Sequence, residues 1–241
     1  MNVAAIIPAA GVGTRMKSPS PKQFIPLGDG SVLIHTLGKF AACSRVPAAC
    51  VSLREADMPG FRQELEQWGL SDFARLVAGG AHRQESVYNG FKELDSGTDI
   101  VVVHDGVRPF VEPAMIEAVI DTAAEKGSAI VALPCIDTVK QVERQRVVAT
   151  LPREKIVMVQ TPQAFRYDIL EEAFEKARAD HYYASDESCL VERLGYPVTV
   201  LLGSERNIKI TKPADLPLAE LFVRQSSSPG VRAEPQSGGS S

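Results

Sequence analysis

The chain has 241 residues, of which 44% are hydrophobic and 23% are charged, a composition typical of globular proteins. Its net charge of −4 at pH 7 excludes a general nucleic-acid binder, because such a protein needs a basic excess to neutralise phosphates. The four cysteines form no C-x-x-C pair and the four histidines are scattered, so neither a disulfide framework nor a zinc site is expected.

The distribution of apolar and polar residues along the chain bears on its location and its domain organisation. No apolar run approaches the roughly 20 residues of a membrane helix, and Met1–Asn2 leads directly into a strand-like segment that leaves no room for a signal peptide. We therefore expect a cytoplasmic protein with no membrane partner. No linker divides residues 1–225, which we expect to form one domain, and residues 226–241 have the composition of a disordered tail.

Short apolar runs alternate with helical patterns from the start of the chain. The runs are nearly continuous, as in strands that are covered on both faces of a parallel sheet. Strands are expected at Val3–Ile7, Ala48–Leu53, Leu76–Ala78, Ile100–His104 and Ala129–Leu133. Helices are expected at Val32–Ala42, which Ser31 would cap, and at Phe61–Trp68, Gln84–Leu94 and Pro113–Lys126. The alternation predicts an α/β, Rossmann-like fold with a mainly parallel sheet flanked by helices.

After Pro134 the alternation of strands and helices stops. Asp137–Val159 is polar and alternates in part, so we expect a β-ribbon that projects from the domain. Beyond it the pattern predicts helices at Tyr167–Ala179 and Asp186–Leu194, strands at Val198–Leu202 and Ile208–Ile210, and a last helix at about Ala214–Arg224.

The strongest chemical signal is the segment P-A-A-G-V-G-T-R-M at Pro8–Met16, followed by Pro21 and Lys22. Small residues after a buried strand let the backbone approach a ligand and point its N–H groups at phosphate oxygens. Arg15 and Lys22 add full positive charges. A dinucleotide fingerprint would need a glycine where Met16 stands, and a Walker loop would need G-K-[ST], so neither fits.

The segment resembles that of the nucleotidyltransferases that activate sugars and polyols. Five further blocks, in order along residues 3–223, resemble those of the 2-C-methyl-D-erythritol 4-phosphate cytidylyltransferase family. They are G-G-A-H-R-Q-E-S-V at Gly79–Val87, V-H-D-G-V-R-P at Val103–Pro109, D-T-V-K at Asp137–Lys140, T-P-Q at Thr161–Gln163 and N-I-K-I-T at Asn207–Thr211.

The resemblance implies a reaction in non-mevalonate isoprenoid synthesis. CTP and methylerythritol phosphate would give the CDP-alcohol and diphosphate, with Mg²⁺ on the triphosphate as cofactor. Arg15 and Lys22 would contact the triphosphate, and Lys209 would grip the phosphate of the alcohol. The nucleotide would be lined by Pro8, Ala9, Ala10, Gly11, Gly13, Gly80 and Ser86.

For the alcohol the family pattern implies Asp105, Arg108 and Thr161, with Asp105 bound either to a hydroxyl or to a metal ion. In the family the ribbon crosses to a second copy, so Thr138 and the catalytic Arg153 would reach the partner's site in a homodimer.

Three positions need separate comment. Ala81 stands where relatives often have an acidic residue, so a contact there would come from backbone. Ser185 either contacts substrate or caps a helix. His104 points to the face opposite Asp105 and is expected to be structural.

Two alternatives remain at the level of sequence. The first is ribitol-5-phosphate cytidylyltransferase, which shares the fold and the reaction but acts on a linear polyol. The second is a non-catalytic nucleotide-binding module. The joint presence of Arg15, Lys22, Asp105 and Lys209 argues against it, because a sensor has no need to position an incoming phosphate.

Overall fold

The computed structural model describes residues 1–11, 13, 16 and 20–227. Its centre is a seven-stranded sheet with the strand order β11-β7-β10-β6-β1-β4-β5. The strands are β1 (Val3–Pro8), β4 (Ala49–Leu53), β5 (Ala74–Ala78), β6 (Ile100–Val103), β7 (Ser128–Pro134), β10 (Val157–Arg166) and β11 (Thr199–Leu202). Every described neighbour pair is parallel except those of β10, which is antiparallel to β6 and β7. The predicted fold class is confirmed.

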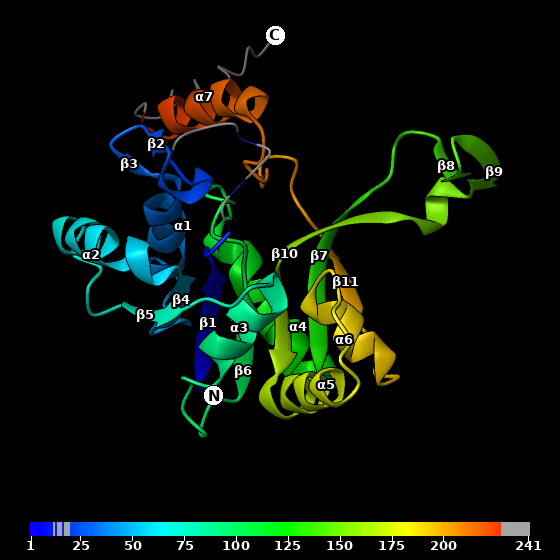
Figure 1. Cartoon of the computed structure of the whole chain (residues 1–241), viewed down its shortest axis with the longest axis horizontal. Coiled ribbons are helices and arrows are strands. Elements are labelled where there is room, and N and C mark those ends of the chain that lie inside the picture. Colours follow the sequence, from blue (N-terminus) through cyan, green and yellow to red (C-terminus); the bar gives the residue numbers. More distant parts are fainter. Residues whose placement is uncertain (12, 14–15, 17–19, 228–241) are drawn as a thin grey trace, which may run out of the picture.

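Helices cover both faces of the sheet (Figure 1). They are α1 (Val32–Ala41), α2 (Met58–Gln67), α3 (Arg83–Phe91), α4 (Pro113–Lys126), α5 (Tyr167–Ala179), α6 (Glu187–Arg193) and α7 (Leu216–Ser227). Each predicted helix is present, with boundaries shifted by three residues or fewer. The Ser31 side chain accepts a hydrogen bond from the Ile34 amide and caps α1 as predicted.

The pleat of each strand divides the core into two layers. In β6, Ile100 and Val102 pack in the cluster that contains α1, α2 and α4, whereas Val101 and Val103 pack in the cluster with α3, α5 and α6. The next two residues continue the alternation. His104 is fully buried against Phe40 of α1, and Asp105 faces α3, so the predicted placement of His104 on the face opposite Asp105 is confirmed.

β10 is the strand of the main sheet that the sequence did not predict. Its first residues, Val157–Val159, were assigned to the ribbon, but they pair with β7 inside the main sheet. Pro162 and the polar residues around it make this segment unlike a central strand. A register shift between Val159 and Gln163 accommodates Pro162, and Gln163 is completely buried.

The predicted ribbon is present and shorter than expected. β8 (Val139–Glu143) and β9 (Arg146–Leu151) form a separate antiparallel pair, joined by Arg144 and Gln145, both at positive φ. The pair projects from the body beyond the ends of β7 and β10 (Figure 1). We refer to β8 and β9 as the arm.

Two further features complete the fold. The strand predicted at Ile208–Ile210 is wrong: this segment is irregular and is held by the Ile210 amide, which donates to the Val107 carbonyl at 2.9 Å. The short strands β2 (Pro26–Leu27) and β3 (Gly30–Ser31) form a hairpin beneath α7 (Figure 1). In the described ranges, no helix combines the length and apolar character that a membrane crossing requires. Most of the predicted tail lies outside these ranges.

Candidate active site

The loops that carry the predicted nucleotide contacts meet at the carboxyl ends of β1, β5 and β6, where ligands collect in open α/β sheets. They enclose a cleft of about 500 Å³. Its lining residues are Pro8, Ala9, Ala10, Gly11, Lys22, Gln23, Arg54, Gly80, Ala81, His82, Arg83, Ser86, Asp105, Val107 and Lys209. Many of the site residues predicted from the sequence are therefore brought together in one cleft. Arg15 lies outside the described residues.

A second pocket of about 230 Å³ adjoins this cleft. It is lined by Arg83, Asp105, Arg108, Val159, Gln160, Thr161, Gln163, Ser185, Asp186 and Lys209. The side chains of Arg83, Asp105 and Lys209 line both cavities and form a common wall. Two ligands that occupied the two cavities would meet at this wall.

Small residues allow the loops of the larger cleft to pack tightly. A Cβ atom on Gly79 would lie 2.3 Å from the Cβ of Ala10, so the loops after β1 and β5 touch only because glycine is present. The Gly80 amide donates to Ser86 Oγ at 3.0 Å, and this hydroxyl donates to the His82 carbonyl. Ser86 therefore fixes the shape of the glycine loop.

Lys22 begins a short 3₁₀ turn (Lys22–Phe24) beside the first loop. A Cβ atom on Gly13, which has φ +66°, would lie 3.1 Å from Lys22 Cγ, so the lysine stem packs over this glycine. The next residue, Gln23, is 1% exposed and donates from Nε2 to the Ala9 carbonyl at 2.6 Å. Gln23 thus ties the turn that carries Lys22 to the loop at Ala9. Gln23 follows the Pro21–Lys22 pair directly and was not among the predicted site residues.

Asp105 is surrounded by cations. Its Oδ1 lies 3.2 Å from Arg83 Nε, and its Oδ2 lies 2.7 Å from Lys209 Nζ and 3.6 Å from Arg108 Nε. Burial alone would raise the pKa of Asp105, but Arg83, Lys209 and Arg108 outweigh burial and hold that pKa well below its usual range. The carboxyl group is therefore ionised at neutral pH and can only accept hydrogen bonds.

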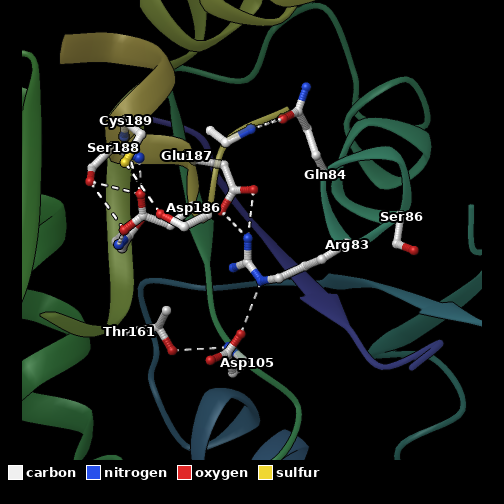
Figure 2. A network of polar contacts seen from close by, with 12 residues as sticks. Arg83, Gln84, Ser86, Asp105, Thr161, Asp186, Glu187, Ser188 and Cys189 are labelled. Carbon is white, nitrogen blue, oxygen red and sulfur yellow. Dashed lines mark hydrogen bonds and ion pairs between the residues drawn. The ribbon is translucent and has the colours of Figure 1, made fainter. Parts of the chain in front are cut away.

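Arg83 connects Asp105 to a second buried carboxylate, as Figure 2 shows. Its Nη1 lies 2.8 and 2.9 Å from the two carboxylate oxygens of Glu187, the first residue of α6. Burial would lower the pKa of Arg83, but Glu187 and Asp105 outweigh it and raise that pKa above its ordinary value. Burial also raises the pKa of Glu187, against the opposing effect of Arg83.

The start of α6 decides one of the open alternatives. Asp186, and not Ser185, caps the helix, because Asp186 Oδ1 accepts from the Cys189 amide at 3.1 Å. The Ser185 hydroxyl lies 3.4 Å from Cys189 Sγ and lines the smaller pocket. The cap interpretation of Ser185 is therefore wrong, and a substrate contact stays a prediction.

Three segments of the smaller pocket are tied together by hydrogen bonds. The Asp105 amide donates to Thr161 Oγ1 at 3.0 Å, and Asn207 Nδ2 donates to the Thr161 carbonyl at 2.8 Å. Arg108 Nη1 donates to the Asn207 carbonyl at 2.7 Å. This network fixes the irregular segment that presents Lys209, which explains how a residue outside any strand is held in the wall.

Thr138 and Arg153, which flank the arm, lie elsewhere. Arg153 is exposed and donates from Nη1 to the Ile136 carbonyl at 2.7 Å, and Thr138 is exposed just before β8. Neither residue lines the two cavities of its own chain.

Comparisons with known proteins agree with this geometry. A sequence model of the family described as 2-C-methyl-D-erythritol 4-phosphate cytidylyltransferase matches residues 3–225. The chain belongs to this family. It is therefore a nucleotidyltransferase, as the sequence blocks predicted.

Relatives with the family's name match over almost their whole length. The protein from Solibacter usitatus is 50% identical over 236 residues, which cover 93% of this chain and 97% of the relative. The protein from Acidobacterium capsulatum is 47% identical over 95% of this chain and 100% of the relative. The ribitol phosphate alternative finds no support in these names.

Solved structures give the same result. The crystal structure of 4-diphosphocytidyl-2C-methyl-D-erythritol synthase from Anaerococcus prevotii has a TM-score of 0.82 at 30% identity, covering 92% of this chain and 96% of its own. The 2-C-methyl-D-erythritol 4-phosphate cytidylyltransferase from Thermus thermophilus has a TM-score of 0.78 at 35% identity, covering 93% and 100%.

Arg83 and Glu187 were absent from the predicted site for different reasons. Arg83 stood inside the G-G-A-H-R block, so the motif contained the signal although no role was assigned to it. Glu187 lies 104 residues from Arg83 and beside Asp186 at a helix start, where an acidic residue ordinarily faces solvent and the helix dipole. Only the fold reveals its buried partner.

Proposed function

We propose that the chain transfers CMP from CTP to 2-C-methyl-D-erythritol 4-phosphate, with release of diphosphate, in non-mevalonate isoprenoid synthesis. The observation that carries this proposal is the pair of adjoining cavities with a shared wall of Arg83, Asp105 and Lys209. A transfer between two anionic substrates needs two sites that meet at a cationic boundary, and a nucleotide sensor needs only one.

CTP occupies the larger cleft in this proposal. The backbone of Pro8, Ala9, Ala10 and Gly11 surrounds the nucleotide, while the Gly80 loop held by Ser86 faces its cytidine. Gly13 packs against the Lys22 stem and does not line the cleft, so its contact with the nucleotide stays a prediction. Lys22 and Arg15 neutralise the triphosphate. Ala81 is exposed and offers only backbone groups.

The polyol phosphate occupies the smaller pocket. Asp105, Thr161 and Ser185 present oxygen atoms suited to its hydroxyl groups, and Lys209 receives its phosphate. Both carboxylate oxygens of Asp105 already face cations, so Asp105 holds Lys209 and Arg108 in place as well as facing the substrate.

The reaction is an in-line displacement at phosphorus. An oxygen of the polyol phosphate forms a bond to the α-phosphorus of CTP, and the bond from that phosphorus to the bridging oxygen of diphosphate breaks, with the electron pair leaving on diphosphate. Such a step depends on positioning and on stabilising the charge of the transition state. Lys209 aligns the incoming oxygen, while Lys22 and Arg15 stabilise the departing diphosphate.

The chain's own side chains do not fit a protein-held metal at this wall. Asp105 is the one carboxylate among the described residues that line the larger cleft, and cations occupy both of its oxygens. No cluster of three or more His, Cys, Asp or Glu side chains is found in the described part of the chain. We therefore propose that Mg²⁺ arrives bound to the triphosphate oxygens of CTP, as is usual for this ion.

We further propose that two copies form a homodimer with exchanged arms. The arm exposes apolar side chains that water does not favour, including Val142 at 55% and Val147 at 61%. Contact with a second copy would cover them and would bring Thr138 and Arg153 to the partner's site. We place the enzyme in the cytoplasm, where its substrate CTP is made.

One assay tests the function. The protein is incubated with CTP, Mg²⁺ and either methylerythritol phosphate or ribitol 5-phosphate, and diphosphate release is followed. We expect release with methylerythritol phosphate and little with ribitol 5-phosphate. Preferential release with ribitol 5-phosphate would transfer the chain to the alternative activity, and no release with either would favour the nucleotide-binding module.

Gly79→Ala tests the assignment of the larger cleft to CTP. The new methyl group would collide with Ala10 and push the two nucleotide loops apart. Because overpacking costs about 1–3 kcal/mol, we expect the KM of CTP to rise by about tenfold. Gly60→Ala is the matched control, because a Cβ atom on Gly60 in α2 meets no atom within 4 Å. Equal KM values in both variants would contradict the assignment.

A further inference from the structure

Glu187 is a buried carboxylate that no substrate role explains. Its side chain is 1% exposed, and it lines neither cavity. Burial of an ionised carboxylate is costly unless it is paired. A partner is present here, since both oxygens of Glu187 accept hydrogen bonds from Nη1 of Arg83 at 2.8 and 2.9 Å.

The other edge of the Arg83 guanidinium faces the reaction site. Its Nε donates to Asp105 Oδ1 at 3.2 Å, so Arg83 spans the distance between α6 and the common wall (Figure 2). The second oxygen of Asp105 lies 2.7 Å from Lys209 Nζ. The position of Lys209 therefore depends on how strongly the Asp105 carboxylate attracts Lys209 relative to its other cations, Arg83 and Arg108.

Glu187 changes the net charge of this group of side chains. Arg83, Arg108 and Lys209 against Asp105 alone would leave two net positive charges, and Glu187 reduces the excess to one. Without the charge of Glu187, Arg83 would have Asp105 as its one anionic partner among the described contacts. It would then compete with Lys209 for the carboxylate, because opposite charges attract and the Asp105 side chain is only 9% exposed.

The backbone that carries Glu187 is anchored independently of this pair. Gln163 Nε2 donates to Asp186 Oδ2 at 2.7 Å, and the Ser188 amide donates to Gln163 Oε1 at 3.3 Å. These contacts join the start of α6 to β10. A change in the charge of Glu187 should therefore leave the helix in place.

We propose that Glu187 is a positioning residue for the transfer reaction. By holding Arg83, it leaves Asp105 paired with Lys209, so that Lys209 stays aimed at the phosphate of the polyol substrate. The inference rests on the proposed function and assigns Glu187 a role that acts through another side chain.

Glu187→Gln removes the charge and retains the shape. We expect kcat to fall by at least about tenfold, because a small displacement of a reacting group is costly. The KM of methylerythritol phosphate should rise more than about threefold, while the KM of CTP stays within about threefold. Glu187→Asp, which retains the charge, should recover most of the activity. Glu192→Gln, the same change at an exposed position of α6, is the control.

A double variant tests whether Glu187 acts through Arg83. If it does, Arg83→Gln/Glu187→Gln should have a kcat within about threefold of Arg83→Gln alone, because the effect of Glu187 disappears with its partner. Additive losses would overturn the proposal, as would a folded Glu187→Gln variant with wild-type kinetics.

Thermal unfolding of each variant checks the fold. Should Glu187→Gln not fold, the comparison of Arg83→Gln with the charge-balanced double variant decides the question. A wild-type protein without activity would contradict the proposed function itself, whereas an active wild type with an unaffected Glu187→Gln variant would contradict only the role of Glu187.

Discussion

Replacement of Lys22 by alanine should lower kcat by about 10²–10³-fold with little change in stability. Removal of one preorganised group that stabilises transition-state charge commonly lowers the rate by about this factor. Lys22 begins a short 3₁₀ turn at the edge of the larger cleft, and its side chain is only partly buried. The turn should persist in the variant, since Gln23 holds it to Ala9 by a separate hydrogen bond.

Steady-state kinetics with CTP and methylerythritol phosphate measure this effect, and thermal unfolding checks the fold. Lys126→Ala is the matched control, because Lys126 is exposed in the last turn of α4 and lines neither cavity. A kcat of Lys22→Ala within about threefold of wild type would show that Lys22 does not stabilise the transition state. Arg15→Ala should behave like Lys22→Ala, a prediction that rests on the family resemblance alone.

Arg153→Ala should also lose most activity, although Arg153 lies outside both cavities of its own chain. In a dimer with exchanged arms, each site combines the body of one copy with the arm of the other. Mixing Arg153→Ala with Lys22→Ala then creates one intact site in each mixed dimer. After complete exchange of equal amounts, about half of the dimers are mixed, so activity should return to about a quarter of wild type.

A second mixture controls for this restoration. Lys22→Ala and Lys209→Ala both alter the body, so every site of their mixed dimers retains one lesion and activity should stay low. Subunit exchange is measured separately with two fluorescent labels. Exchange without recovery in the Arg153→Ala mixture would exclude the shared site, whereas recovery in both mixtures would show that the gain has another origin.

Much of the fold could be predicted from local patterns. Nearly continuous apolar runs identified β1, β4, β6 and β7, because strands that are buried on both faces carry apolar residues at most positions. Helical spacing predicted α4 and α5 with the boundaries that the structure has. The division into one domain over residues 1–225 and a tail stays a prediction.

β10 could not be predicted from local patterns because the hydrogen bonds that stabilise it are made with residues far away in the sequence. Gln163 and Thr161 are buried polar residues that a strand pattern would place at a surface, and Pro162 cannot donate to a neighbouring strand. Their hydrogen bonds reach Asp186, Asp105 and Asn207, which are distant in the chain. The same reason explains Ile208–Ile210, where an apolar alternation predicted a strand. This irregular segment is held by the backbone bond from Ile210 to Val107 and by the hydrogen bonds of Asn207 to Arg108 and Thr161.

The amino-acid sequence by itself determined the family of this protein, since short ordered blocks carry the family pattern, and the residues in those blocks are the ones predicted to contact the nucleotide and the phosphate. The tertiary structure alone decided how those residues are held. Asp105 faces Arg83, Arg108 and Lys209 at once, and Glu187 pairs with Arg83 from the start of α6. Charge balance in a buried site depends on distances between residues far apart in sequence, and folding alone creates those distances.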